Sequence, residues 1–336
     1  MTAPFERALL GLLPALGLLA VLVYFDGYKL VRLRTVVALL ASGAVIAAAT
    51  YPLSRLFLEC FPMPLPLYSR YVAPVGEELL KALVVVALVR AHRIGFLVDA
   101  AISGFAVGTG FGVAENLYYL HLLPSAGLGV FLVRGFGTAL MHGGATAIVG
   151  VLGVAALERR PDAWVRAFLP GLLLAVVLHS AFNHFFLSPL LSTSGIVLVL
   201  PILFQAIFAR SERSVGEWIG RGFDGDVATL ELINSGRFAG SPAGRYLHAL
   251  KDRFEGPVVA DLLCYLQLHI ELSLRAKGVL LMRESGFAPQ VDEATRAAFV
   301  ELRYLGKSVG RTGLRAIRPM LGMTGKDLWQ LHMLDR

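Results

Sequence analysis

Charged residues and cysteines are scarce in this sequence. Only 16% of its 336 residues are charged and 56% are hydrophobic, which is too apolar for an ordinary water-soluble domain of this size. The two cysteines carry little functional information. An H-E-x-x-H zinc motif, internal repeats and low-complexity runs are all missing. The composition instead indicates a chain that faces lipid.

Long apolar runs fill the first two thirds of the chain. A membrane-spanning helix needs about 20 predominantly apolar residues, and about seven such runs precede residue 211, whereas none follows it. Because Met1–Glu6 brings no positive charge and no small-residue cleavage site follows, the first run is interpreted as a retained span. The predicted spans are 8–25, 35–58, 71–90, 97–120, 130–157, 167–187 and 195–210.

Basic residues occur in alternate loops, which predicts the orientation. Cytoplasmic loops are enriched in Lys and Arg, so we expect the amino terminus outside and the carboxyl terminus in the cytoplasm. The same bias explains much of the net charge of +7, and nucleic acid is not an expected partner. The basic loop residues are Lys29, Arg32, Arg34, Arg90, Arg93, Arg159, Arg160, Arg166, Arg210 and Arg213.

The composition changes near residue 211 to charged, amphipathic segments interrupted by Gly and Pro. Ser241-Pro242 predicts a helix start, and Gly256-Pro257 predicts the start of a long segment that ends near Gly286. The expected fold is all-α. It has a polytopic transmembrane bundle over residues 1–210 and a soluble, cytoplasmic, all-α domain over residues 211–336.

Ionisable residues inside the predicted spans are the main functional signal, because each costs a few kcal/mol to insert and usually faces the protein interior. The third span contains Glu77, Glu78 and Lys81 directly after Pro74. Glu77 and Lys81 are four residues apart, so they share a helix face and can pair. An interfacial charge cluster without a catalytic role is the alternative interpretation of this segment.

Glu115 lies on the fourth span, three residues after the last glycine of the series Gly104, Gly108 and Gly112. Glycines four residues apart allow close helix packing, so Glu115 is predicted to point toward other helices. It could also be a structural acid bonded to a neighbouring hydroxyl group.

Two histidines complete the predicted polar layer. His142 lies on the fifth span, and His179 lies on the sixth, where it shares a helix face with Asn183. Counting along each helix puts Glu77, Glu115 and His179 at about 7 to 12 Å below the outer surface and His142 at up to about 18 Å. Four helices should therefore supply polar groups to the outer half of the bundle.

This residue set suits peptide hydrolysis, which needs a base for water and donors for the oxyanion. In one mechanism Glu77 or Glu78 is the base, and His142, His179 and Asn183 are the donors. In the other, Glu115, His142 and His179 hold Zn²⁺ and Glu77 is the base. The sequence does not decide between them.

The motifs resemble the PrsW family of intramembrane proteases, which is related to the CAAX prenyl endopeptidases. The similarity covers about residues 70–190 and implies cleavage of membrane-anchored protein substrates, as in site-1 cleavage of an anti-sigma factor. It implies a catalytic role for the paired glutamates and the histidines, with a metal or by glutamate alone. The motifs are E-E-x-x-K at Glu77, Glu78 and Lys81, F-x-x-x-E-N at Phe111, Glu115 and Asn116, R-x-x-x-T-x-x-x-H at Arg134, Thr138 and His142, and H-x-x-x-N at His179 and Asn183.

An intramembrane endopeptidase acting near the outer face is therefore the predicted function. A proton-coupled transporter is one alternative, because buried carboxylates beside Lys and His also form proton relays. Against it, Asp99 is the one ionisable residue that continues toward the cytoplasmic face. A membrane scaffold for the cytoplasmic helical domain is another alternative, and it leaves the clustered acids unexplained.

Overall fold

The computed structural model describes residues 2–287, 289, 292–321 and 325–334. Helices make up 87% of it, and the described residues contain no strand, so the predicted all-α fold class is confirmed. The chain divides into two compact units, Met1–Glu212 and Arg213–Arg336. The helix α9 belongs to both, because its 46 residues run from Pro189 to Asn234.

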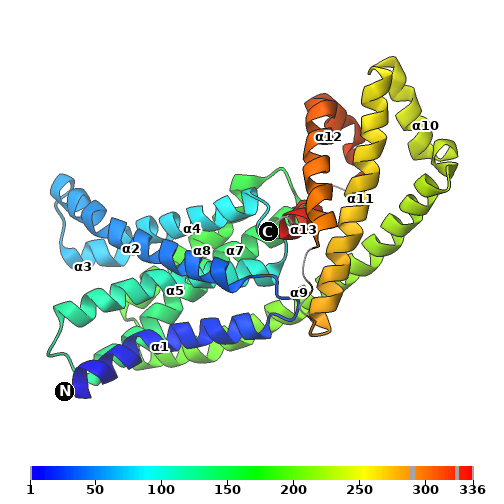
Figure 1. Ribbon diagram of the computed structural model, residues 1–336. Helices are drawn as coiled ribbons and strands as arrows, with labels where there is room; N and C mark the ends of the chain where they lie inside the picture. Colours follow the sequence, from blue (N-terminus) through cyan, green and yellow to red (C-terminus); the bar gives the residue numbers. More distant parts are fainter. Residues whose placement is uncertain (1, 288, 290–291, 322–324, 335–336) are drawn as a thin grey trace. The chain divides into compact units, whose positions relative to one another are not determined.

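The first unit is a bundle in which the long helices run side by side (Figure 1). Its central helix is α5, whose most apolar stretch is 89% buried and which packs against α1, α2 and α7. The elements before α9 are α1 (Thr2–Phe25), α2 (Leu33–Cys60), α3 (Leu65–Leu67), the π-helix η1 (Tyr68–Val72), α4 (Ala73–Arg90), α5 (Leu97–Leu122), α6 (Leu128–Val133), the π-helix η2 (Arg134–Ala139), α7 (Leu140–Arg159) and α8 (Trp164–His184).

Glycines bring the backbones of α5 and α7 into direct contact. A Cβ atom added at Gly108 would lie 2.1 Å from the carbonyl oxygen of His142, and one added at Gly104 would lie 2.6 Å from that of Thr146. No larger residue fits these positions without moving a helix. The close approach predicted from the glycine series is therefore confirmed, and it places the Glu115 end of α5 beside α7.

Seven helices among the described residues are long and apolar enough to cross a membrane, and six of them coincide with runs that the sequence predicted. The segment predicted at 71–90 is not among them, because α4 carries four charged residues in its 18. The expectation that no such helix follows residue 210 is wrong, because α11 (Gly256–Glu284) qualifies. Its interspersed charges lower its mean hydropathy to 1.3, so the sequence pattern did not indicate a spanning helix there.

The second unit contains the remainder of α9, followed by shorter helices that pack on α11. As predicted, Ser241 caps α10 by accepting a hydrogen bond from the Gly244 N–H group, and α11 begins at Gly256. The elements that follow α9 are η3 (Arg237–Gly240), α10 (Pro242–Ala249), η4 (Leu250–Asp252), α11, α12 (Glu293–Ile317), η5 (Arg318–Met320) and α13 (Gly325–Leu334).

A buried polar network joins three helices of the second unit. The Lys277 ammonium on α11 donates to the Asp226 carboxylate on α9 at 2.5 Å. Ser273 donates to the same carboxylate at 2.8 Å, and it accepts from the Gln330 amide on α13 at 2.8 Å. Because these groups form hydrogen bonds with one another, α11 can bury a face that contains polar side chains within its own unit.

Candidate active site

The beginning of α4 has an irregular hydrogen-bond pattern. The N–H group of Ala73 bonds to the carbonyl oxygen of Tyr68, five residues earlier, as in a π-helix. The next residue, Pro74, has no N–H group. A backbone N–H group at position 74 would donate to the carbonyl oxygen of Ser69 in a π-helix and to that of Arg70 in an α-helix. These two carbonyl groups therefore need other donors.

The helix α8 supplies both donors. The Asn183 side-chain nitrogen donates to the carbonyl oxygen of Ser69 at 2.9 Å, and the Ser180 hydroxyl donates to that of Arg70 at 2.6 Å. These two bonds fix α8 against the start of α4, just before its paired glutamates. Asn183 was predicted to be an oxyanion donor, but its amide nitrogen is bonded to the protein's own backbone.

Glu78 is the centre of the buried polar cluster. One of its oxygens, Oε1, accepts from the Lys81 ammonium at 2.6 Å and from His179 Nδ1 at 2.8 Å, and it lies 3.8 Å from His142 Nδ1. The side chains of Glu78 and Lys81 are 0% exposed. Burial of this pair is tolerated because the charges are matched and hydrogen-bonded.

Lys81 also determines how His142 is protonated. Its ammonium group lies 2.9 Å from His142 Nδ1 and 4.5 Å from the centre of the Phe111 ring, where a cation–π contact stabilises it. A lysine ammonium can only donate, so Nδ1 accepts. The proton of a neutral His142 is then on Nε2, which lies 3.3 Å from Glu115 Oε2 and donates to it.

His179 has the opposite tautomer. Its Nδ1–H group donates to the Glu78 carboxylate, so its Nε2 carries the lone pair. That nitrogen lies 3.9 Å from Glu77 Oε2. A carboxylate that fixes a histidine in this way is the usual arrangement behind a metal-binding imidazole.

Glu115 occupies a second, more open part of the cluster. The Arg134 guanidinium lies 3.2 Å from Glu115 Oε2, and the Arg134 Nε–H group donates to Asn116 Oδ1 at 3.0 Å. The Asn116 amide donates to the carbonyl oxygen of Gly11 on α1 at 2.6 Å. The Glu115 side chain is 29% exposed, whereas that of Glu78 is fully buried.

Three side chains are close enough to share a metal ion. Glu77, His142 and His179 each offer one ligand atom, and the three atoms lie within 4.8 Å of one another. Two imidazoles and a carboxylate are a suitable donor set for zinc. The sequence interpretation had Glu115 as the third ligand. In the structure the Glu115 carboxylate pairs with Arg134 instead, and Glu77 completes the group.

A family model for the PrsW family of intramembrane metalloproteases matches residues 31–208, more than half of the chain. The chain belongs to the PrsW family. It is therefore an intramembrane peptidase, and this membership decides against the transporter and scaffold interpretations. No individual curated protein and no solved structure matches it.

The sequence interpretation missed two residues that shape the site of this PrsW-family protein. Ser180 could have been inferred from Pro74, because a proline in the first turn leaves an earlier carbonyl group without its backbone donor. Phe111 was noted only as part of a motif. Its contact with Lys81 depends on the packing of α4 against α5, and no local pattern indicates that contact.

Proposed function

We propose that this PrsW-family protein is a zinc-dependent endopeptidase that cleaves membrane-tethered protein substrates near the outer face of the membrane. The observation that carries this proposal is the group formed by Glu77, His142 and His179, with ligand atoms within 4.8 Å of one another. These residues come from α4, α7 and α8 and bind the ion. When bound, zinc would act as a Lewis acid on the scissile carbonyl group and would favour the deprotonation of water.

Glu78 and Lys81 support the metal ligands without touching the substrate. Glu78 holds His179 in the tautomer that presents Nε2, and Lys81 balances the charge of Glu78. Both side chains are fully buried, which is why neither is assigned a direct role in the reaction. Because Lys81 occupies Nδ1 of His142, His142 would hold the ion through Nε2, which must then lose its proton.

Glu115 is assigned as the general base and Arg134 as the oxyanion donor. Glu115 is the carboxylate of the cluster with the greater exposure, at 29% compared with 21% for Glu77. It takes a proton from the attacking water and returns it to the leaving amide nitrogen. The adjacent guanidinium stabilises the charge that develops on the scissile carbonyl oxygen. In the zinc mechanism inferred from the sequence, Glu115 was a metal ligand and Glu77 was the base. Here Glu77 is the proposed ligand and Glu115 is the proposed base.

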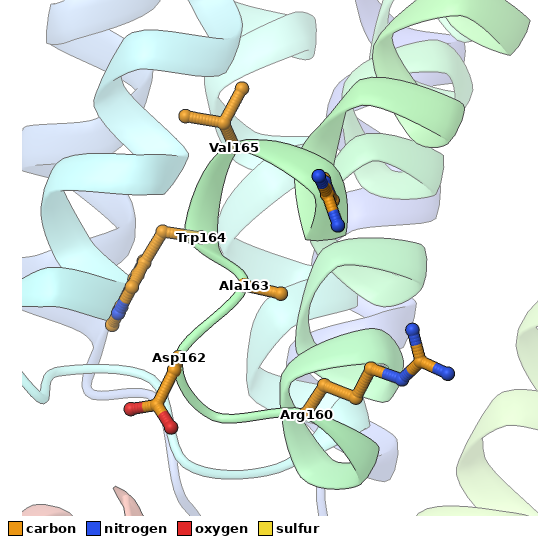
Figure 2. A pocket seen from close by; sticks show the side chains of 6 residues that line it. Arg160, Asp162, Ala163, Trp164 and Val165 are labelled. Carbon is orange, nitrogen blue, oxygen red and sulfur yellow. The ribbon is translucent and has the colours of Figure 1, made fainter.

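The proposed orientation is supported by the positions of the basic loops. The Arg90 guanidinium, before the α4–α5 loop, lies 5.7 Å from the ring centre of Trp164, which follows the α7–α8 loop. Figure 2 shows that loop, where Arg160 and Trp164 line an open pocket. The Val98 N–H group, at the start of α5, donates to the Ser211 hydroxyl near the basic end of the α9 span. Three basic segments thus occupy one end of the bundle, which we assign to the cytoplasm.

We assign residues 1–210 to the transmembrane protease domain and residues 211–336 to a cytoplasmic helical domain. The helix α11 remains in the second domain despite its apolar composition, because its partners α12 and α13 cover it and its buried face carries the Lys277–Asp226 ion pair. Such a pair is costly in contact with lipid. This domain lies wholly outside the matched region, which ends at residue 208.

A glutamate-only mechanism is the second candidate, and one observation favours it. The Lys81 ammonium lies 2.9 Å from His142 and puts a positive charge beside the ligand group. A metal ion must bind despite this charge. Without a metal, Glu77 would be the base and the histidines would be hydrogen-bond donors.

Metal analysis of the purified protein, together with cleavage of a single-span test substrate, separates the two mechanisms. We expect chelator to inactivate the enzyme and zinc to restore it, and we expect His142→Ala and His179→Ala to lose the metal. Glu115→Gln should keep the metal and lose about 10² to 10⁴ in rate. Glu59→Gln, which removes an exposed carboxylate, is the control and should match the wild type. Full activity of metal-free protein would contradict the zinc proposal.

A further inference from the structure

A groove of about 440 Å³ separates α2 from η1 and the beginning of α4. This volume is within the range of pockets that bind small molecules or peptide side chains. One wall is a single face of α2, because its residues follow the helical spacing i, i+3, i+4 and i+7. The lining residues are Thr50, Leu53, Ser54 and Phe57 on α2, and Tyr68, Tyr71, Val72, Ala73, Val75, Gly76, Glu77 and Leu80 opposite them.

The groove and the candidate active site share Glu77. Glu77 lines the groove and is also a member of the metal-capable group. A substrate segment lying in the groove would therefore contact one member of the ligand group.

The groove opens sideways at the surface of the bundle. Leu53 on one wall is 51% exposed and Val75 on the other is 50% exposed, so both face the lipid in the proposed orientation. Tyr68 joins the two walls, because its hydroxyl donates to the Ser54 hydroxyl at 2.6 Å and the centre of its ring lies 5.8 Å from that of Phe57.

Gly76 leaves the groove open beside Glu77. A Cβ atom added at Gly76 would have no neighbouring atom within 4 Å, so the space that a side chain would fill is empty. This contrasts with the glycines of α5, where helix packing requires the missing side chain.

We propose that this groove binds an extended, apolar segment of the membrane-tethered substrate, which enters sideways from the bilayer with the scissile bond beside Gly76. The inference rests on the proposed endopeptidase function and adds the substrate path and its preference for apolar residues. A peptide must be unwound before its amide bond can be attacked, and unpaired backbone groups are costly in lipid. A groove that ends at the catalytic group shields the unwound segment from the hydrocarbon.

Cross-linking tests the occupant independently of catalysis. Leu53→Cys and Leu56→Cys are compared in full-length protein from which the natural cysteines are removed by Cys60→Ser and Cys264→Ser. The two positions are matched, because both leucines are on α2 and are similarly exposed, at 51% and 57%. Only Leu53 lines the groove. A set of single-span substrates with one cysteine near the scissile bond should cross-link to position 53 at least several-fold more than to position 56. Equal cross-linking would overturn the proposal.

Filling the groove is the second test. Gly76→Phe should lower the rate of substrate cleavage about 10- to 100-fold, with unchanged metal content and thermal stability. Gly195→Phe is the matched control, because Gly195 also has no atom within 4 Å of an added Cβ and lies on α9, away from the groove. Wild-type cleavage by Gly76→Phe would overturn the proposal. If that variant instead loses only a co-purified lipid, the groove is a lipid site.

The two tests distinguish failure of the groove from failure of the proposed function. If the wild type cleaves no tethered substrate but cross-linking is specific to position 53, the endopeptidase assignment fails and the binding groove stands. If the wild type cleaves the substrate and neither position 53 nor Gly76→Phe has an effect, the function stands and the groove assignment is wrong.

Discussion

Glu77 and Glu78 are adjacent in the sequence but lie in different environments. Successive residues are about 100° apart around an α-helix, so the two carboxylates point in different directions, and Glu77 lines the groove whereas Glu78 does not. The Glu77 side chain is 21% exposed, whereas that of Glu78 is 0% exposed and contacts both Lys81 and His179. In the proposed zinc mechanism, the more exposed Glu77 is a metal ligand and the buried Glu78 orients His179.

Replacing Glu78 should weaken both metal binding and the fold. Glu78→Gln removes the charge that fixes His179, and we expect an affinity for zinc about 10- to 100-fold lower. It also leaves Lys81 buried without a counter-charge, which should cost about 3 kcal/mol of stability. The double variant Glu78→Gln/Lys81→Met should recover stability but not activity. Titration of bound zinc and thermal unfolding measure the two effects, and full activity of Glu78→Gln would exclude the orienting role.

Asn183 and Ser180 should behave alike if both position the start of α4. Asn183→Ala and Ser180→Ala each remove one donor to a carbonyl group near Pro74, and each should cost about 1 kcal/mol of stability. Both should lower cleavage by similar factors. An oxyanion donor behaves differently, because its loss costs about 10² to 10³ in rate for that residue alone. A large rate loss in Asn183→Ala with none in Ser180→Ala would restore the catalytic assignment of Asn183.

At the scale of elements, a π-helical turn precedes the site residues on two of the contributing helices. The turn η1 ends just before α4 and its glutamates, and η2 ends just before α7 and His142. A π-helical turn changes the rotational position of everything that follows it, and such turns are frequent at functional sites. These two turns help to direct Glu77 and His142 toward a common point.

The packing of α5 on α7 is the second requirement for the site. Gly108→Val would force a side chain into the backbone of α7 and should lower stability by about 1 to 3 kcal/mol. Cleavage should fall with it, because Gly108 packs against the backbone of His142 and Gly143. Gly17→Val on α1 is the control, since an added Cβ there has no atom within 4 Å. Thermal unfolding in detergent checks this result, and equal midpoints for the two variants would contradict it.

At the scale of the whole molecule, the two natural cysteines report the orientation. Both are free and exposed, Cys60 at the end of α2 and Cys264 on α11. In the proposed topology Cys60 is outside and Cys264 is in the cytoplasm.

Labelling with a membrane-impermeant maleimide tests this topology in the full-length protein. Intact spheroplasts should label Cys60 and not Cys264, and permeabilised membranes should label both. The single substitutions Cys60→Ser and Cys264→Ser identify each signal. If α11 crossed the bilayer, Cys264 would lie within the hydrocarbon and would stay unlabelled after permeabilisation. Labelling of Cys264 alone from outside would reverse the orientation.

The sequence by itself determined the solvent and the fold class of this protein. Long apolar runs need a bilayer, and ionisable residues within such runs must face other helices. Local rules also predicted the Ser241 cap and a close helix approach at the glycines of α5, because each depends on neighbours in the chain or on a short repeat. The motifs indicated the PrsW family before any contact was known.

The tertiary structure alone decided which side chains meet. Glu77 rather than Glu115 completes the metal-capable group with His142 and His179, although Glu115 contacts His142 and also pairs with Arg134. The Asn183 side chain donates to the carbonyl oxygen of Ser69, because a π-helical turn and a proline lie opposite it. The role of α11 depends on the helices that cover it, because mean hydropathy does not distinguish a buried helix from a spanning one. Distances between residues on different helices depend on packing, which no local pattern encodes.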